Sequence, residues 1–292
     1  MRRRVAQIVI FTGACLLADE SHVRAQSTAC PPSSASASDD KGSSGPRISI
    51  TEVTFSGFLQ IPIPDRDPIA DSIKQKEYGN SLDGLIDDAV ERVKAGWRDR
   101  GYFKVRASGE EATLSSSPTS RRIALSFHVD EGLQYRLREI TFKNNKVIRD
   151  LAALRGLFPI NDGDIFSREK VATGLDNLRK AYGDMGYINF VSVPDAKLDD
   201  DNRLASLDID VDEGKQFHMG AVNILGLDES TRKELLDTFP MKRGQIYDNK
   251  LFESFLVNHA SMFPEGGHGY SLKQNAKAGT VTASFDFRPC PD

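Results

Sequence analysis

The sequence has 292 residues, of which 39% are hydrophobic and 27% are charged, and its formal net charge is −4. This length accommodates two or three domains of ordinary size, and the composition is that of a soluble globular protein. The negative net charge argues against a nucleic-acid partner, which would favour a basic face.

The first 25 residues predict an export signal rather than part of the fold. Residues 2–4 are three arginines, and residues 5–18 form a mostly apolar run that is too short to cross a bilayer. Residues 23–25 then place small side chains where a signal peptidase would cut. An alternative is lipidation of Cys15, because residues 12–15 resemble a degraded lipobox.

The next residues, 26–47, are rich in Ser, Ala, Pro, Gly and Asp and predict a disordered linker. Export implies an oxidising compartment, so Cys30 and Cys290 form a candidate disulfide. Folded units of roughly 25–30 Å each could hold the two ends further apart than the roughly 60 Å that the linker can span. The bond therefore requires a bent array or a second chain, and the pairing stays open.

One pattern recurs with a period of about 80 residues. Gly-Tyr pairs begin at Gly101, Gly186 and Gly269, and Asp-Glu-Gly triplets close the first two copies. The recurrence predicts three structural units. Their predicted boundaries are 48–132, 133–214 and 215–290.

The first unit is predicted to contain a strand, two helices and a hairpin. Apolar residues recur at helical spacing from Leu85 to Trp97, and Gly101 would end that helix in the left-handed conformation. Apolar and polar residues alternate in the hairpin, which indicates half-buried strands. The expected elements are strand 48–55, helix 71–78, helix 85–97, strand 103–107 and strand 123–129.

The second and third units repeat this order, so each reads β-α-α-β-β. His128, Asp208 and Asp210 fall in the outward phase of their strands, which indicates a sheet with helices on one face and water on the other. The second unit is expected to have strand 137–142, helices 147–157 and 171–185, and strands 188–193 and 204–211. The third is expected to have strand 220–225, helices 231–238 and 252–263, and strands 270–273 and 281–287.

The Gly-Tyr and Asp-Glu-Gly motifs, in this order of elements, resemble POTRA domains, which form the periplasmic arm of BamA/TamA-type outer-membrane assembly pores. The resemblance covers about residues 48–287 and is closer in the first two units. It implies an α+β fold of three tandem domains, each a three-stranded mixed sheet with two helices on one face. It also implies a periplasmic location at the outer membrane.

The resemblance further implies protein partners: unfolded or β-rich clients, and an outer-membrane β-barrel protein or assembly machinery. Family members continue into a β-barrel, whereas five residues follow Phe287 here. We therefore expect a scaffold or chaperone arm whose barrel is supplied by another chain. The alternative is a barrel-less fragment or split subunit of such a pore.

In the strand order implied by the resemblance, the second strand of each unit lies at a sheet edge, where an extended client could pair with it. Pro194 ends the middle edge and cannot donate a hydrogen bond, so we predict docking at the first and third units. The alternative is that these edges are merely tolerated. The predicted docking residues are Phe103, Lys104, Val105, Arg106, Ala107, Tyr270, Ser271, Leu272 and Lys273.

Two serines stand three residues before a lysine, as in penicillin-binding enzymes. Ser167 and Ser230 each begin a predicted helix, and the sequence has no Lys-Thr-Gly partner, so we interpret both as N-caps. The Asp-Glu-Gly triplets are interpreted as joints between units, and residues 199–201 as a solvated hairpin tip rather than a calcium site. We expect no enzyme, cofactor, metal or small-molecule substrate; a cell-envelope hydrolase is the disfavoured alternative.

Overall fold

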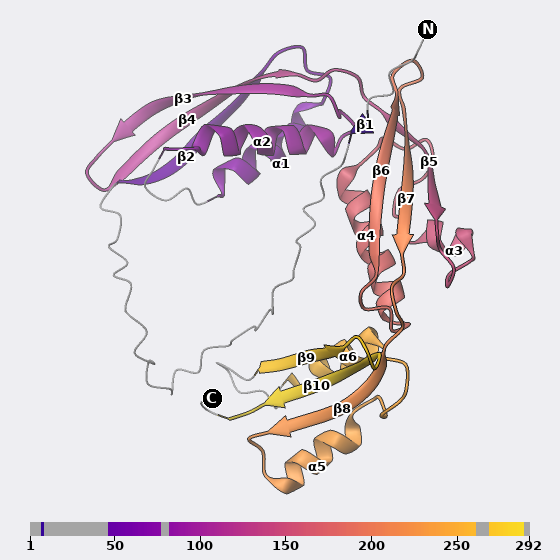
Figure 1. Cartoon of the computed structure of the whole chain (residues 1–292). Helices are drawn as coiled ribbons and strands as arrows, with labels where there is room; N and C mark the ends of the chain where they lie inside the picture. The colour runs from indigo at the N-terminus through magenta and orange to yellow at the C-terminus, as the bar shows by residue number, and fades with distance from the viewer. Residues whose placement is uncertain (1–6, 9–45, 77–81, 261–268, 289–292) are drawn as a thin grey trace.

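The computed structural model describes residues 7–8, 46–76, 82–260 and 269–288 (Figure 1). The predicted signal peptide, the predicted linker and both cysteines of the candidate disulfide lie outside the described residues, apart from residues 7, 8, 46 and 47.

Three separate mixed sheets follow one another along the chain, which confirms the predicted fold class. In each sheet the third strand is central, parallel to the first and antiparallel to the second. The first sheet has the order β2 (Arg47–Ser56), β4 (Ser120–Asp130), β3 (Arg106–Ser116). The second has β5 (Arg136–Lys143), β7 (Leu204–Asp212), β6 (Val191–Asp199), and the two-residue strand β1 (Gln7–Ile8) lies beyond β6. The third has β8 (His218–Leu225), β10 (Thr280–Asp286), β9 (Gly269–Asn275).

Two helices accompany each sheet, and Figure 1 shows α1 and α2 together on one side of the first sheet. The first unit has α1 (Ile63–Lys74) and α2 (Leu85–Arg98), the second has α3 (Leu151–Gly156) and α4 (Arg168–Gly183), and the third has α5 (Glu229–Thr238) and α6 (Asn249–Asn258).

Helix α1 begins earlier than the predicted helix 71–78. Its first turn contains Pro64, which is tolerated there because the first amides of a helix have no intrahelical acceptor. Pro68 lies further inside and removes one helical hydrogen bond. Ile69 and Ile73 are buried on the sheet side, and this packing holds the helix despite the two prolines.

Each unit has its own apolar core. In β4 the inward residues Ile123, Leu125, Phe127 and Val129 are almost completely buried, whereas His128 between them is exposed. Burial of each such side chain contributes about 1.5–3 kcal/mol, so the alternation fixes which face of the sheet the helices cover.

One of the two predicted helix N-caps, Ser167 and Ser230, is confirmed. Ser167 caps α4, because its hydroxyl accepts a hydrogen bond from the Lys170 amide at 3.3 Å. The prediction for Ser230 is wrong: Asp228 caps α5 by accepting from the Thr231 amide at 3.0 Å. A carboxylate two residues earlier provides the oxygen that the helix start needs.

The glutamate of the first Asp-Glu-Gly triplet is more than a turn residue. Glu131 is 2% exposed and accepts hydrogen bonds from the indole Nε1 of Trp97 at 2.9 Å and from the amides of Gln60 at 2.7 Å and Ile61 at 3.3 Å. It therefore ties the end of β4 to α2 and to the loop that leads into α1.

The second triplet repeats this arrangement with Glu213, and we call Glu131 and Glu213 the clip glutamates. Glu213 accepts from the Tyr182 hydroxyl at 3.0 Å and from the amides of Lys146 and Val147, each at 2.7 Å. Burial raises the pKa of Tyr182, and its hydrogen bond to Glu213 adds to the rise. The triplets thus close the first two units internally, in addition to supplying the glycine of the joint.

Candidate partner-binding edges and joints

The second strands β3, β6 and β9 each lie next to the central strand and away from the first strand of their sheet. Along β3 and β9 the structure shows no further pairing among the described residues. A row of backbone N–H and C=O groups on such a margin can accept an added strand.

Three of the predicted docking residues of the first unit do not lie on this edge. Val105 is buried in the core of the first unit, whereas Phe103 is buried in the core of the second, with its ring centroid 4.7 Å from that of Phe166. Lys104, between them, reaches Asp200 in the second unit. The apolar alternation that predicted a strand here comes from a segment anchored in two cores.

Arg106 and Ala107 do lie on β3, at its start. The Arg106 guanidinium pairs with Asp130 across the hairpin at 2.5 Å and holds the pKa of that carboxyl below its usual value. The strand continues to Ser116, well beyond the predicted end at residue 107, and exposes Leu114 on the way. The open edge strand of the first unit is therefore longer than the predicted strand 103–107 and lies later in the chain.

All four predicted docking residues of the third unit lie on β9. Tyr270 is 50% exposed and Leu272 is 37% exposed. They stand opposite Phe285 and Ala283 of β10, both buried, and so extend the core face of the sheet to its edge. A strand added beyond β9 would cover these two side chains, while Ser271 and Lys273 would face water.

The middle edge differs from its prediction in where proline lies. Pro194 is inside β6, opposite Ile209 of β7, rather than after the end of the strand. Prolines in sheets are confined to edges because they cannot donate to a ladder. Further along, β1 (Gln7–Ile8) pairs with β6 opposite Ala196 and Lys197. That this edge is blunted stays a prediction.

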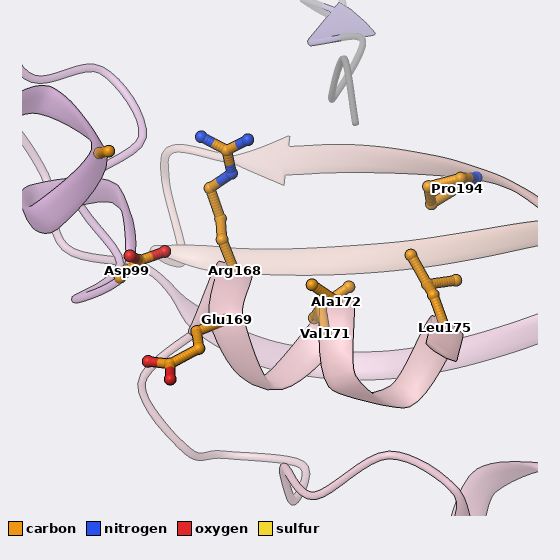
Figure 2. A pocket seen from close by; sticks show the side chains of 8 residues that line it. Asp99, Arg168, Glu169, Val171, Ala172, Leu175 and Pro194 are labelled. Atoms are coloured by element: carbon orange, nitrogen blue, oxygen red, sulfur yellow. The ribbon is translucent and has the colours of Figure 1, made fainter. Parts of the chain in front are cut away.

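A pocket of about 370 Å³ lies beside β6, between the first and second units. Figure 2 shows Asp99, Arg168 and Glu169 toward one end, and Leu175 of α4 with Pro194 toward the other. Burial raises the pKa of the Asp99 carboxyl, and the nearby Arg168 opposes the rise.

The first joint is the contact between the first and second units. There the residues that follow α2 pack against the residues that precede β5. Gly101 has φ of 85°, and its carbonyl accepts the Tyr135 amide at 2.9 Å. A Cβ on Gly101 would lie 2.7 Å from the carbonyl oxygen of Tyr135. The side chain of Gln134 donates to the carbonyl of Arg100 at 2.9 Å.

The second joint has the same construction. Gly186 has φ of 84°, its carbonyl accepts the Phe217 amide at 2.8 Å, and a Cβ would lie 2.7 Å from the Phe217 carbonyl oxygen. Gln216 donates to the carbonyl of Met185 at 3.0 Å. The Gly-Tyr motifs at Gly101 and Gly186 are therefore joints as well as helix terminators, because only glycine leaves room for the next unit.

The first joint also has an ionic contact. Asp200 accepts hydrogen bonds from the Lys104 ammonium at 2.5 Å and from the Tyr135 hydroxyl at 2.6 Å. Lys104, and then Tyr135, hold the pKa of Asp200 below its usual value. The sequence predicted that the hairpin tip, residues 199–201, is only solvated. The structure corrects this prediction, because Asp200 in the tip contacts Lys104 of the first unit.

Within the part of the chain that the structure describes, no group of three or more His, Cys, Asp or Glu residues is placed to hold a metal ion. None of the described helices combines the length and the hydropathy that a membrane span requires.

The middle unit matches a family model described as POTRA, "Surface antigen variable number repeat", over residues 135–214. The folded region also superposes on the crystal structure of Haemophilus influenzae BamA POTRA3-5 with a TM-score of 0.60 at 18% identity, covering 82% of this chain and 95% of that one. The chain therefore has the fold of POTRA domains in tandem.

Two curated proteins are similar in sequence. The outer membrane protein assembly factor BamA of Neisseria meningitidis serogroup B is 23% identical over 254 residues, which are 82% of this chain and 31% of that protein. A putative outer membrane protein assembly factor of Treponema pallidum is 25% identical over 206 residues, which are 67% of this chain and 24% of that protein. The chain thus spans less than a third of the length of either relative.

Proposed function

We propose that this chain is an exported arm of POTRA domains that binds other proteins during outer-membrane protein assembly, at the periplasmic side of the membrane. The family match of the middle unit and the similarity to assembly factors support this role. The binding is non-covalent and requires no catalytic group or cofactor.

The proposed mode of binding is strand addition at an open edge, with β9 as the main site and β3 as the second. The observation that carries it is the position of Tyr270 and Leu272, which are half-exposed beside a strand margin. An added strand would gain backbone hydrogen bonds, each with a net contribution of about 0.5–1.5 kcal/mol, and would cover these two side chains. Backbone pairing places little demand on sequence, which suits partners that are unfolded or β-rich.

A proline scan of β9 tests this mode. The probe is an outer-membrane β-barrel protein diluted from urea, and its affinity for the full chain is measured by fluorescence anisotropy. Proline at Ser271 or at Leu272 removes an amide from one or the other side of the strand, because successive amides point to opposite margins. The substitution that removes the outward amide should weaken binding about 10-fold while β9 stays paired with β10.

The matched control is Leu272→Ala, which keeps the amide and shortens the side chain; we expect a loss of affinity of about 3-fold or less. Circular dichroism and thermal unfolding identify which proline variant keeps its fold. A folded proline variant that binds the probe as tightly as the parent chain would overturn strand addition at β9.

A further inference from the structure

A groove of about 540 Å³ opens at the second joint, between the second and third units. Val147 and Met185 line it from the second unit, and Ile246 and Leu251 line it from the third. Val147, Ile246 and Leu251 are 36%, 46% and 42% exposed. Contiguous exposed apolar side chains with a polar rim are typical of interaction sites.

The first joint lacks this combination at the corresponding positions. Val147 and Ile61 both donate their own amide to a clip glutamate, yet Ile61 is 4% exposed. Leu251 and Lys170 both donate their amides to a helix cap, so a lysine stands where the groove has a leucine. Because the backbone of the two joints is alike, the groove results from side chains of the second joint.

The rim of the groove is acidic. Asp184 and Asp248 line it, and none of the described residues that line it is a lysine or arginine. Asp184 accepts the Lys250 amide at 3.0 Å, and Asp248 caps α6 through the Leu251 amide at 2.9 Å. Each carboxylate can accept further hydrogen bonds, since it offers about four lone-pair sites.

The Asp184 carboxylate lies in an environment that favours an added cation. Burial raises the pKa of Asp184, and Asp248 and Glu253 add to the rise by repulsion, while the amide and the charge of Lys250 oppose it. A basic side chain placed between Asp184 and Asp248 would offset this repulsion and the cost of burying a charge.

We propose that this groove is a docking site for a segment of a partner protein that presents apolar side chains next to a lysine or arginine. The apolar side chains would cover Val147, Ile246 and Leu251, and the basic group would pair with Asp184 and Asp248. An amphipathic basic helix has this chemistry and inserts its apolar face into such a groove. The site uses none of the residues of β3 or β9, so it is independent of strand addition.

The test uses the full chain and two fluorescein-labelled amphipathic helical peptides, one built of Leu and Lys and the other of Leu and Glu. We expect the Leu–Lys peptide to bind at least about 10-fold more tightly. Leu251→Ser and Asp248→Asn should each weaken its binding about 5-fold, and Asp248→Asn keeps the helix cap because asparagine caps as well as aspartate. Thermal unfolding checks that both variants are folded.

The matched control is Leu225→Ser. Leu225 is 47% exposed, close to the value for Leu251, and lies at the end of β8 away from the joint. Its substitution should leave the affinity for the Leu–Lys peptide unchanged, as should the proline substitution in β9. Equal affinities for the two peptides, or equal effects of Leu251→Ser and Leu225→Ser, would overturn the proposal.

Discussion

The two joints of this chain share a backbone and differ in their side chains. In both, a glycine with positive φ presents its carbonyl to the amide of the next unit, and a glutamine donates back to the carbonyl before that glycine. Beyond this, the first joint contains Lys104, Tyr135 and Asp200 in one hydrogen-bonded group.

The second joint has different side chains at those positions. Asn189 follows its glycine as Lys104 follows Gly101, and Phe217 replaces Tyr135 without a hydroxyl. Lys215 there donates to the carbonyls of Ala276 and Lys277 instead of to a carboxylate. The comparison teaches that the repeated motif sets how units are connected, while the unrepeated residues set charge and exposed surface.

The largest effect is expected from substituting the joint glycines. Gly101→Ala and Gly186→Ala each place a Cβ 2.7 Å from a backbone carbonyl oxygen in a left-handed conformation. Positive φ alone costs about 1–3 kcal/mol for other residues, and the clash adds to it. We expect a lower unfolding temperature and an altered small-angle scattering profile for both variants.

Gly156→Ala is the control for these variants. Gly156 ends α3, and a Cβ there would meet no described atom within 4 Å. Alanine should leave stability unchanged or raise it slightly. If Gly101→Ala behaved like this control, the proposed steric role of the joint glycine would be wrong.

The next largest loss of stability is expected from substituting the clip glutamates, Glu131 and Glu213. Glu131→Gln exchanges one acceptor oxygen for a donor among three donor groups in a buried site, so we expect a loss of about 2–3 kcal/mol in the free energy of unfolding. Glu213→Gln should cost less, because Glu213 is only partly buried. Urea denaturation measures both, and a larger effect for Glu213 would contradict the ranking.

Smaller effects are expected from the ionic contact of the first joint. Tyr135→Phe recreates the second joint's side chain, and Asp200→Asn removes the charge. Because Lys104 and Asp200 are 39% and 51% exposed, we expect their coupling to be about 0.2–1 kcal/mol in a double-mutant cycle of Lys104→Met and Asp200→Asn. Spin-label distances should broaden across the first joint and stay unchanged across the second.

The smallest effect is a pH dependence that only the first joint should show. The folded pKa of Asp200 is below its usual value, so its stabilisation is complete above an ordinary aspartate pKa of about 4 and is lost as pH falls through the folded pKa. Asp99 at the first joint and Asp184 at the second both have raised pKa values. Their contributions to the pH dependence of the two joints therefore largely cancel when the joints are compared. Spin-label distances across the first joint should broaden in acid for the parent chain, with no such transition in Asp200→Asn.

Local patterns in the sequence determined the order of the elements in each unit, although α1 begins earlier than predicted and residues 103–105 precede the strand. The recurrence of Gly-Tyr predicted three units, and the alternation from Ile123 to Val129 predicted both a strand and its buried face. These predictions succeeded because helical and strand periodicity depend on neighbours within a few residues. The position of β9 at a sheet edge came instead from the strand order that the resemblance implies.

Contacts between units were decided only by the tertiary structure. Phe103 and Val105 alternate like strand residues, yet they enter two different cores. Lys104 meets Asp200 across 96 positions of sequence, and the groove beside Leu251 exists only where two units meet. A period of two or of 3.6 residues carries no information about such distant partners, because it records which side of one element is buried and not which neighbour buries it.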